Sequence, residues 1–463
     1  MDAWHETTAH GFPDRVASAL SALCDSGLRM RPPRTGGHAG DGLLTFAAVD
    51  DTTIEALRHI THTSRNRVIA LQVAGAPLKP QDYQRLIQAG ADEILSWLAP
   101  AQHTAACVVA RMLRWKEVDV IVDSDLVRGT LVGQSAVWRA TLRRIVEIAC
   151  FTDAPVLITG ESGTGKELVA RLIHALDRRA GKRNLVVVDC TTLQSELMGS
   201  ELFGHERGAF TNALASREGA CQLADKGTLF LDEIGEISPT LQPQLLRVLQ
   251  ERSFKPVGAN HWNTAQFRLI CATNRSFDDE IKIGRFRADL YYRIADCIVS
   301  LPSLRERSED TLPLAEHLLN EMSGGRRLTL SEPVREFLLR RQFPGNVREL
   351  RRLLSRVCSR HSGNGLITVG DIPEDEWRIG AAACCDWRDA HLDHAIHRAI
   401  QLGAPLKELT QYATTTAIRH VLAQEMGNLQ RAAVRLGMSD RALQLRRAQE
   451  RGASAFGALP GEA

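Results

Sequence analysis

The sequence lacks the patterns that mark an exported or membrane-embedded protein. Its ten cysteines are scattered and no two are separated by two residues, so neither a disulfide framework nor a zinc ribbon is expected. No stretch of about 18 uncharged apolar residues occurs, and the first residues show no basic start followed by an apolar run. We therefore expect a cytoplasmic protein without a membrane partner.

An excess of charge of one sign is also missing. The 57 basic and 55 acidic residues leave a net charge of +2, so any binding to nucleic acid must come from a local patch. The content of 44% hydrophobic and 24% charged residues excludes collagen-like and wholly disordered chains. A length of 463 residues predicts about three domains.

Short apolar runs alternate with amphipathic segments near the start of the chain. The runs at 43–49, 67–75 and 92–97 predict strands of a small parallel sheet with crossover helices. The last helix and strand, RLIQAGADEILSW, resemble the closing elements of response-regulator receiver domains. Since Ser96 and Trp97 stand where such domains carry Lys-Pro, we interpret residues 1–120 as a degenerate receiver-like sensory domain.

Asp50 is the candidate phosphoacceptor of this domain, because it follows an apolar strand. No acidic pair follows an opening strand, however, and the distance from Asp50 to the next strand is short for a receiver. A structural aspartate at a strand end is therefore the alternative interpretation.

A second α/β pattern begins near residue 130, and strands give way to helical periodicity near residue 312. These changes predict an α/β core over 130–305 and a helical lid over 306–362. A segment rich in Gly, Pro and charge predicts a linker over 363–405, and further helices follow over 406–455.

A glycine-rich loop directly follows the strand VLITG. Its glycines permit successive backbone N–H groups to curl around a phosphate, and the following helix adds its dipole. Lys166 would reach the β and γ phosphates, while Glu167 replaces the usual hydroxyl ligand of Mg²⁺. A chance glycine-rich turn is the alternative. The candidate ATP-binding loop consists of Gly160, Glu161, Ser162, Gly163, Thr164, Gly165, Lys166 and Glu167.

Two acids end the apolar strand GTLFLDE about 65 residues downstream. Asp232 would hold Mg²⁺ through water, and Glu233 would polarise the attacking water. The alternative is an acidic pair that caps the next helix. The glycine-rich loop upstream favours the catalytic interpretation.

Seven motifs occur in this order along the chain: GESGTGKE, ELFGHERGAFTNA, GTLFLDEIGE, LLRVLQERSFKPVG, ATNR, FRADLYYRI and FPGNVREL. Together they resemble the AAA+ domain of bacterial enhancer-binding proteins, the activators of sigma-54 RNA polymerase. The resemblance covers about residues 130–360 and the C-terminus. The family also commonly has Glu after the lysine of the phosphate loop.

The resemblance implies roles for further residues. Thr273 and Asn274 match the sensor I pair that reads the γ-phosphate, and Arg348 matches the sensor II arginine of the lid. Arg287 and Arg293 match the arginines that act on the neighbouring subunit's nucleotide, where a guanidinium stabilises developing charge. For each arginine a surface salt bridge is the alternative.

The loop GAFTNA, residues 208–213, matches the GAFTGA loop with which the family contacts the sigma factor. Its apolar tip and hydroxyl suit a contact that is made and withdrawn with nucleotide state. Asn replaces the second glycine, and Asn tolerates a left-handed backbone well. The expected sigma-factor contacts are Gly208, Ala209, Phe210, Thr211, Asn212 and Ala213.

Asp189 is a second departure from the family, which commonly has Asn at this position to hold the catalytic glutamate in an inactive position. Asn donates a hydrogen bond to a carboxylate, whereas an ionised Asp repels it. If Asp189 approaches Glu233, either one proton is shared or the switch works differently.

The C-terminal segment resembles the Fis-type helix-turn-helix of the same activators. LGMS forms the turn, with Ser439 as N-cap of the recognition helix. An arginine-rich solvated helix is the alternative. We expect groove-side contacts from Arg441, Gln444, Arg446 and Arg447, and backbone contacts from Arg431 and Arg435.

The sequence therefore predicts an α/β protein: a P-loop AAA+ domain with a helical lid, a receiver-like domain before it and an all-α Fis-type helix-turn-helix after it. With ATP and Mg²⁺, dimers bound to upstream DNA would assemble into a hexamer that remodels the closed complex of sigma-54 RNA polymerase. Asn212 and Asp189 leave an alternative open. It is a DNA-binding regulator responsive to a nucleotide or second messenger, with weak ATPase activity, that works with another holoenzyme.

Overall fold

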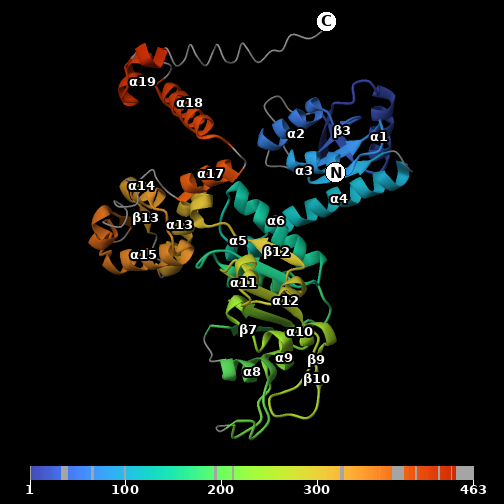
Figure 1. The fold of residues 1–463 in the computed structure, drawn as a ribbon, viewed down its shortest axis with the longest axis vertical. Helices are drawn as coiled ribbons and strands as arrows, with labels where there is room; N and C mark the ends of the chain where they lie inside the picture. Colours follow the sequence, from blue (N-terminus) through green and yellow to red (C-terminus); the bar gives the residue numbers. More distant parts are fainter. Residues whose placement is uncertain are drawn as a thin grey trace. The chain divides into compact units, whose positions relative to one another are not determined.

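The computed structural model of the protein describes residues 2–32, 40–63, 67–97, 101–191, 195–210, 213–323, 328–363, 365–377, 390–401, 404–425, 428–439 and 441–444. The chain divides into two compact units, Met1–Trp377 and Arg378–Ala463. The first unit contains two five-stranded sheets and a helical lid, and the described part of the second unit is helical (Figure 1).

The N-terminal sheet has the strand order β2-β1-β3-β4-β5, and all neighbouring strands are parallel. This is the order of flavodoxin-like and receiver-like folds. The three strands expected from the sequence are confirmed. The other two escaped prediction because one carries polar residues along its length and the other has only three residues. The strands are β1 (Asp2–Thr7), β2 (Arg29–Arg31), β3 (Gly42–Phe46), β4 (Val68–Gln72) and β5 (Glu93–Ser96).

Helices cover both faces of this sheet, and alternate strand residues face opposite sides. Leu43 and Leu71 face the helices α1 (Pro13–Asp25) and α4 (Ala101–Val122). Leu44 and Phe46 face the helices α2 (Asp51–Thr63) and α3 (Pro80–Gln88). The last turns of α4 contribute Val118 to the core of the following domain, so this helix belongs to two hydrophobic cores.

The second sheet has the strand order β12-β6-β11-β8-β7 and is also wholly parallel. The carboxyl ends of its strands therefore meet at one edge, where ligands of open α/β sheets bind. The strands are β6 (Val156–Thr159), β7 (Leu185–Asp189), β8 (Thr228–Asp232), β11 (Arg268–Thr273) and β12 (Cys297–Ser300).

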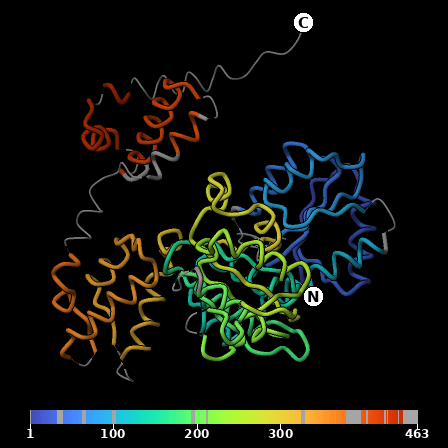
Figure 2. Tube along the Cα trace, turned by 60° about the horizontal axis from the view of Figure 1, so that its bottom comes forward, coloured from blue at the N-terminus to red at the C-terminus, as the bar shows by residue number. Residues whose placement is uncertain are grey.

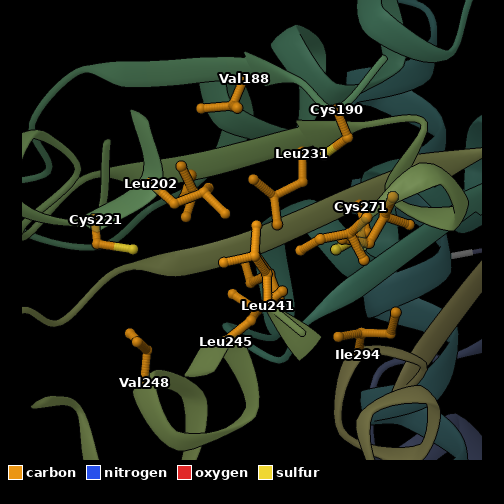
Figure 3. Close-up of a cluster of buried hydrophobic side chains, with 14 of the residues drawn as sticks. Val188, Cys190, Leu202, Cys221, Leu231, Leu241, Leu245, Val248, Cys271 and Ile294 are labelled. Atoms are coloured by element: carbon orange, nitrogen blue, oxygen red, sulfur yellow. The ribbon is translucent and has the colours of Figure 1, made fainter. Parts of the chain in front are cut away.

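Two separate hydrophobic clusters hold this sheet between layers of helices. Ile158 and Phe230 pack with α6 (Ala136–Phe151) and α7 (Lys166–Leu176). On the other face, Figure 3 shows Val188, Leu231 and Cys271 of three neighbouring strands close to Leu202, Leu241 and Leu245. The helices on that face are α8 (Ser195–Phe203), α9 (Ala220–Leu223), α10 (Gln242–Glu251) and α12 (Ala288–Ile294). The remaining elements of the domain are α5 (Asp125–Thr130), η1 (Ile234–Glu236), β9 (Ser253–Phe254), β10 (Asn263–Thr264) and α11 (Phe277–Lys282).

The lid is a bundle of helices, drawn in orange in Figure 2. It has its own hydrophobic core. It continues beyond the boundary expected from the sequence. Residues 365–377, expected in the linker, pack on the lid, because β14 pairs with β13 and Glu376 forms a buried ion pair with Arg341. The lid elements are η2 (Leu304–Asp310), α13 (Thr311–Met322), β13 (Thr329–Leu330), α14 (Glu332–Arg340), α15 (Asn346–Arg360), β14 (Leu366–Ile367) and η3 (Val369–Asp371).

The second unit contains α17 (Ala390–Gln401), α18 (Leu406–Gln424) and α19 (Leu429–Arg435). A small core of Ile418, Ala432, Ala433 and Leu443 joins the last two helices to the segment after the turn. Across all described residues of both units, no helix is long and apolar enough to pass through a bilayer.

Gly42 provides a test of the N-terminal packing. A Cβ at this position would lie 1.9 Å from the buried indole of Trp4. Gly42→Ala should therefore lower the free energy of unfolding of this domain by about 1–3 kcal/mol through overpacking. The measurement is denaturant unfolding followed by tryptophan fluorescence. Gly11→Ala is the control, because its Cβ would meet no atom within 4 Å; equal stability of the two variants would contradict the packing described.

Candidate nucleotide-binding site

The phosphate loop joins β6 to α7 at the carboxyl edge of the second sheet. Gly160, Gly163 and Gly165 have φ values of 154°, 78° and 102°, which residues with a Cβ rarely adopt. Lys166 is the first residue of α7, so the loop leads into a helix N-terminus. The backbone therefore has the conformation that a phosphate cradle needs.

Lys166 and Glu233 meet at the centre of this edge. The Lys166 Nζ lies 3.1 Å from the Glu233 Oε1 and also donates to the Gly160 carbonyl at 3.1 Å. The other carboxylate oxygen of Glu233 accepts the N–H of Asn274 at 3.0 Å. Glu233 itself has a φ of 48°, a strained value of the kind that gathers at functional sites. The proposed catalytic glutamate is thus held between the phosphate loop and the sensor I segment.

Asp232 ends β8 beside this pair, and its carboxylate accepts the N–H of Glu233 at 3.0 Å. Burial, followed by the negative charge of Glu233, raises the pKa of Asp232 above its ordinary value. A carboxylate in such surroundings suits a divalent cation, whose positive charge would stabilise its charged form. Mg²⁺ is usually bound by one or two carboxylates together with substrate phosphates and water, so the donor set fits this ion.

Asp189 lies next to Asp232 in the strand register. Its Oδ1 accepts the backbone N–H of Thr191 at 2.8 Å and the Thr191 hydroxyl at 2.7 Å. This oxygen is therefore held by its own turn, while Glu233 has Lys166 and Asn274 as its hydrogen-bonding partners.

Thr273 and Asn274, the residues expected to form sensor I, lie at the end of β11 and directly after it. Thr273 is buried and pairs in register with Thr159 of β6, and its carbonyl accepts the N–H of Gly160 at 3.3 Å. The phosphate loop and sensor I are therefore directly connected. Glu167, which follows the lysine of the phosphate loop, forms an exposed ion pair with Arg171.

The lid contacts the opposite side of the phosphate loop. Arg348 donates to the Ser162 hydroxyl at 3.0 Å. Arg305 and Asn346, which sequence reasoning missed, both bind the Glu161 carboxylate. The only available signal was the position of Asn346 inside FPGNVREL. The loop is therefore clamped between the sheet and the lid.

Arg287 directly precedes α12, and Arg293 lies within this helix. The Arg287 guanidinium binds the Asp289 carboxylate through two hydrogen bonds of 3.0 and 2.7 Å. Arg293 donates to the Leu249 carbonyl at 2.9 Å. Both side chains are exposed, which leaves them accessible to a second subunit.

The GAFTNA loop is closed at its base. Gly208, with a φ of 84°, donates its N–H to the Ala213 carbonyl at 2.9 Å. The Phe210 ring packs edge-on against His205, with centroids 4.9 Å apart, and stays 38% exposed. Thr211 and Asn212 lie outside the described residues. The described part presents Phe210 to solvent, as a contact residue requires.

The C-terminal unit shows two capped helix starts. The Asn428 side chain accepts the N–H of Arg431 at 3.2 Å, and the Ser439 hydroxyl accepts the N–H of Ala442 at 3.3 Å. Gly437 between them has a φ of 65°. Arg435 pairs with Glu425 and Arg441 is exposed, whereas Arg446 and Arg447 lie outside the described residues.

Asp50 of the N-terminal domain lies four residues after the end of β3, at the start of α2. Its Oδ1 accepts the Thr53 N–H at 2.8 Å, and this hydrogen bond lowers the pKa of the carboxyl. The Thr53 hydroxyl in turn contacts that of Thr8 at 2.9 Å. Among the described residues, no group of three His, Cys, Asp or Glu side chains is arranged to hold a metal ion. Asp50 therefore acts as a helix cap in this structure.

The parallel sheet, the phosphate loop, the acidic strand end and the lid define a P-loop protein of the AAA+ class. Residues 131–300 match the family described as the Sigma-54 interaction domain, and residues 305–380 match the AAA+ ATPase lid domain. The transcriptional regulatory protein ZraR of Klebsiella oxytoca is 41% identical over 316 residues, which are 68% of this chain and 67% of that protein.

Two further relatives extend this comparison. The Nif-specific regulatory protein of Bradyrhizobium diazoefficiens is 48% identical over 239 residues, 51% of this chain and 41% of that protein. The crystal structure of NtrX from Brucella abortus in complex with ATP aligns with a TM-score of 0.50 and 25% identity, over 99% of each chain. The chain spans less than half of the Nif-specific regulator. It belongs to the family of AAA+ transcriptional regulators that carry the sigma-54 interaction domain.

The role of Asp50 can be tested by two substitutions. Because Asn caps helices as well as Asp, Asp50→Asn should leave both the stability and the activity of the protein unchanged. Asp50→Ala should lower the free energy of unfolding of the N-terminal domain by about 1 kcal/mol, since the Thr53 N–H loses its acceptor. The measurements are denaturant unfolding and incubation with acetyl phosphate. Unchanged stability of Asp50→Ala would contradict the capping role, and phosphorylation of the wild type that disappears in Asp50→Asn would make Asp50 a phosphoacceptor.

Proposed function

We propose that the protein is a sigma-54-dependent transcriptional activator that hydrolyses ATP to remodel the closed promoter complex. The observation that carries this proposal is the meeting of Lys166, Glu233 and the Asn274 N–H at the carboxyl edge of the sheet. A lysine for the phosphates, a carboxylate for the attacking water and a residue in contact with that carboxylate are three of the parts that phosphoryl transfer uses.

ATP with Mg²⁺ is the proposed substrate. The N–H groups of the loop would hold the phosphates, and Lys166 would neutralise their charge. Bound Mg²⁺ would supply neutralisation of the phosphate oxygens next to Asp232. Once phosphates attract Lys166, Glu233 loses one of its two partners and becomes available to a water molecule. The solved complex of NtrX with ATP supports the choice of nucleotide.

Assembly into a hexamer would complete the catalytic site. Arg287 and Arg293 are exposed, and a guanidinium supplied by a neighbouring subunit would stabilise the charge that develops on the γ-phosphoryl group. Hydrolysis would then depend on the contact between subunits. The GAFTNA loop would transmit the change to the sigma factor, with Phe210 as the apolar contact.

The C-terminal unit would place the protein on upstream DNA as a dimer. The capped turn at Asn428–Ser439 supports a helix-turn-helix, because it sets two short helices around a left-handed glycine. The second candidate is a DNA-binding regulator with weak ATPase activity that works with another holoenzyme. The Asp189 carboxylate beside the proposed metal ligand favours it.

In vitro transcription from a sigma-54 promoter separates the two candidates. Lys166→Ala should abolish both ATP hydrolysis and transcription. Phe210→Ala should abolish transcription while ATP hydrolysis stays within about twofold of wild type, because the loop takes no part in the chemistry. Leu214→Ala is the matched control, since this side chain is 87% exposed just beyond the loop. Activity of the wild type with another holoenzyme alone would support the second candidate.

DNA binding has a separate test. Arg441→Ala should weaken binding to the upstream site, because this arginine is expected on the groove side, and it should lower the slope of log affinity against log salt by less than the value of about one that the loss of a phosphate contact gives. Arg419→Ala on α18 is the control, because it removes an equal charge from the same unit. Binding measured by fluorescence anisotropy at several salt concentrations gives the slope. Equal losses for the two variants would contradict a specific role of Arg441.

A further inference from the structure

Asn346 has an unusual backbone conformation for a residue that begins a helix. Its φ is 52° although it is not glycine, and its side chain is completely buried between the lid and the phosphate loop. Asn and Asp are the residues that enter this left-handed region most readily among those with a Cβ. A strained and buried polar residue persists only where its surroundings hold it in place.

The amide group of Asn346 joins three segments of the chain. Its Nδ2 donates to the Glu161 Oε2 and to the Ser162 carbonyl, both at 3.1 Å. Its Oδ1 accepts the N–H of Leu304 at 2.8 Å. The phosphate loop, the segment that leads into the lid and the helix α15 are therefore connected through one side chain.

Neighbouring contacts extend this connection along the loop. The Val347 N–H donates to the Gly163 carbonyl at 3.0 Å, and a Cβ on Gly163 would lie 2.4 Å from the Gly345 carbonyl oxygen. Arg348, the proposed sensor II residue, donates to the Ser162 hydroxyl at 3.0 Å. The contacts of Asn346 thus fix the backbone that carries Arg348 on the phosphate loop.

The negative charge of Glu161 explains why the residue at position 346 must donate a hydrogen bond to it. A carboxylate in a phosphate-binding loop would repel the nucleotide if it faced inward. Here it faces the lid, where Arg305 donates at 2.8 Å and Asn346 supplies a second donor. The hydrogen bond from Arg305 holds the pKa of Glu161 below its usual range. The anion therefore serves the attachment of the lid and leaves the phosphates undisturbed.

We propose that Asn346 is a positioning residue for ATP hydrolysis: it fixes the lid on the phosphate loop through Glu161 and thereby sets Arg348 for the γ-phosphate. This proposal rests on the proposed ATPase function. The groups that bind the phosphates, Lys166 and the loop N–H groups, lie on the other side of the contact. A change at Asn346 should therefore reduce kcat and leave the KM for ATP nearly unchanged.

Asn346→Asp tests this directly. Asp keeps the backbone conformation and the acceptor for Leu304, but it replaces the donor by an oxygen that faces the Glu161 carboxylate and the Ser162 carbonyl. We expect kcat to fall about tenfold or more, with KM within about threefold of wild type. Asn346→Gly, which accepts the positive φ without any side chain, should show the same pattern if the Asn346→Asp variant does not fold.

Glu161→Gln supplies the matched rescue. The single variant keeps an acceptor for Asn346 but loses the charge that Arg305 binds, so its own kcat is the reference for the double variant. In the double variant Asn346→Asp with Glu161→Gln, the new amide can donate to the new carboxylate, so this hydrogen bond is restored in the reverse direction while the donor to the Ser162 carbonyl stays lost. We expect kcat to rise at least severalfold above that of Asn346→Asp, toward the value of Glu161→Gln. A purely structural role would not predict this recovery.

Hydrogen exchange of the Val347 amide gives a second readout that needs no hydrolysis. It should be faster in Asn346→Asp than in wild type and return in the double variant. A wild type that hydrolyses no ATP would refute the proposed function, and the exchange measurement would still test the contact. A wild-type kcat in both Asn346→Asp and Asn346→Gly, or a double variant as slow as Asn346→Asp with unchanged exchange, would overturn the inference.

Discussion

The ion pair between Lys166 and Glu233 is the interaction on which the rest of the site depends. A lysine and a carboxylate 3.1 Å apart, both largely removed from water, stabilise each other and hold three segments of the chain at one edge of the sheet. The order β12-β6-β11-β8-β7 makes this possible, because it places the carboxyl ends of β6, β11 and β8 side by side. Nucleotide phosphates would compete for the lysine, so binding and the release of the carboxylate are coupled through one cation.

The chemistry-bearing part of the fold could be predicted because local sequence determines it. Gly160, Gly163 and Gly165 signal a backbone that only glycine adopts freely, and Asp232 and Glu233 follow a strand whose apolar run is unmistakable. The parallel strands β3, β4 and β5 were equally accessible from their buried runs. Each of these signals lies within about ten neighbouring residues, the range over which periodicity and turn chemistry act.

The remainder depends on contacts between distant residues. Nothing in the local pattern shows that Asn346 meets Glu161, which lies 185 residues earlier in the chain. The Asp50 side chain looked like a strand-end group, and only the position of Thr53 shows that it caps a helix. The boundary of the lid shifted for the same reason, since the ion pair of Arg341 with Glu376 binds residues whose composition indicates a linker. Tertiary partners, which composition and periodicity do not encode locally, determine these features.

In the function proposed for this protein, hydrolysis of ATP, beyond its binding, drives the opening of promoter DNA. The most direct measurement is open-complex formation by sigma-54 RNA polymerase on a promoter with a fluorescent base in the melted region. We expect the wild-type protein to open the DNA with ATP and to fail to open it with a non-hydrolysable ATP analogue at saturating concentration. Equal opening with both nucleotides, or opening in the absence of any nucleotide, would contradict this expectation.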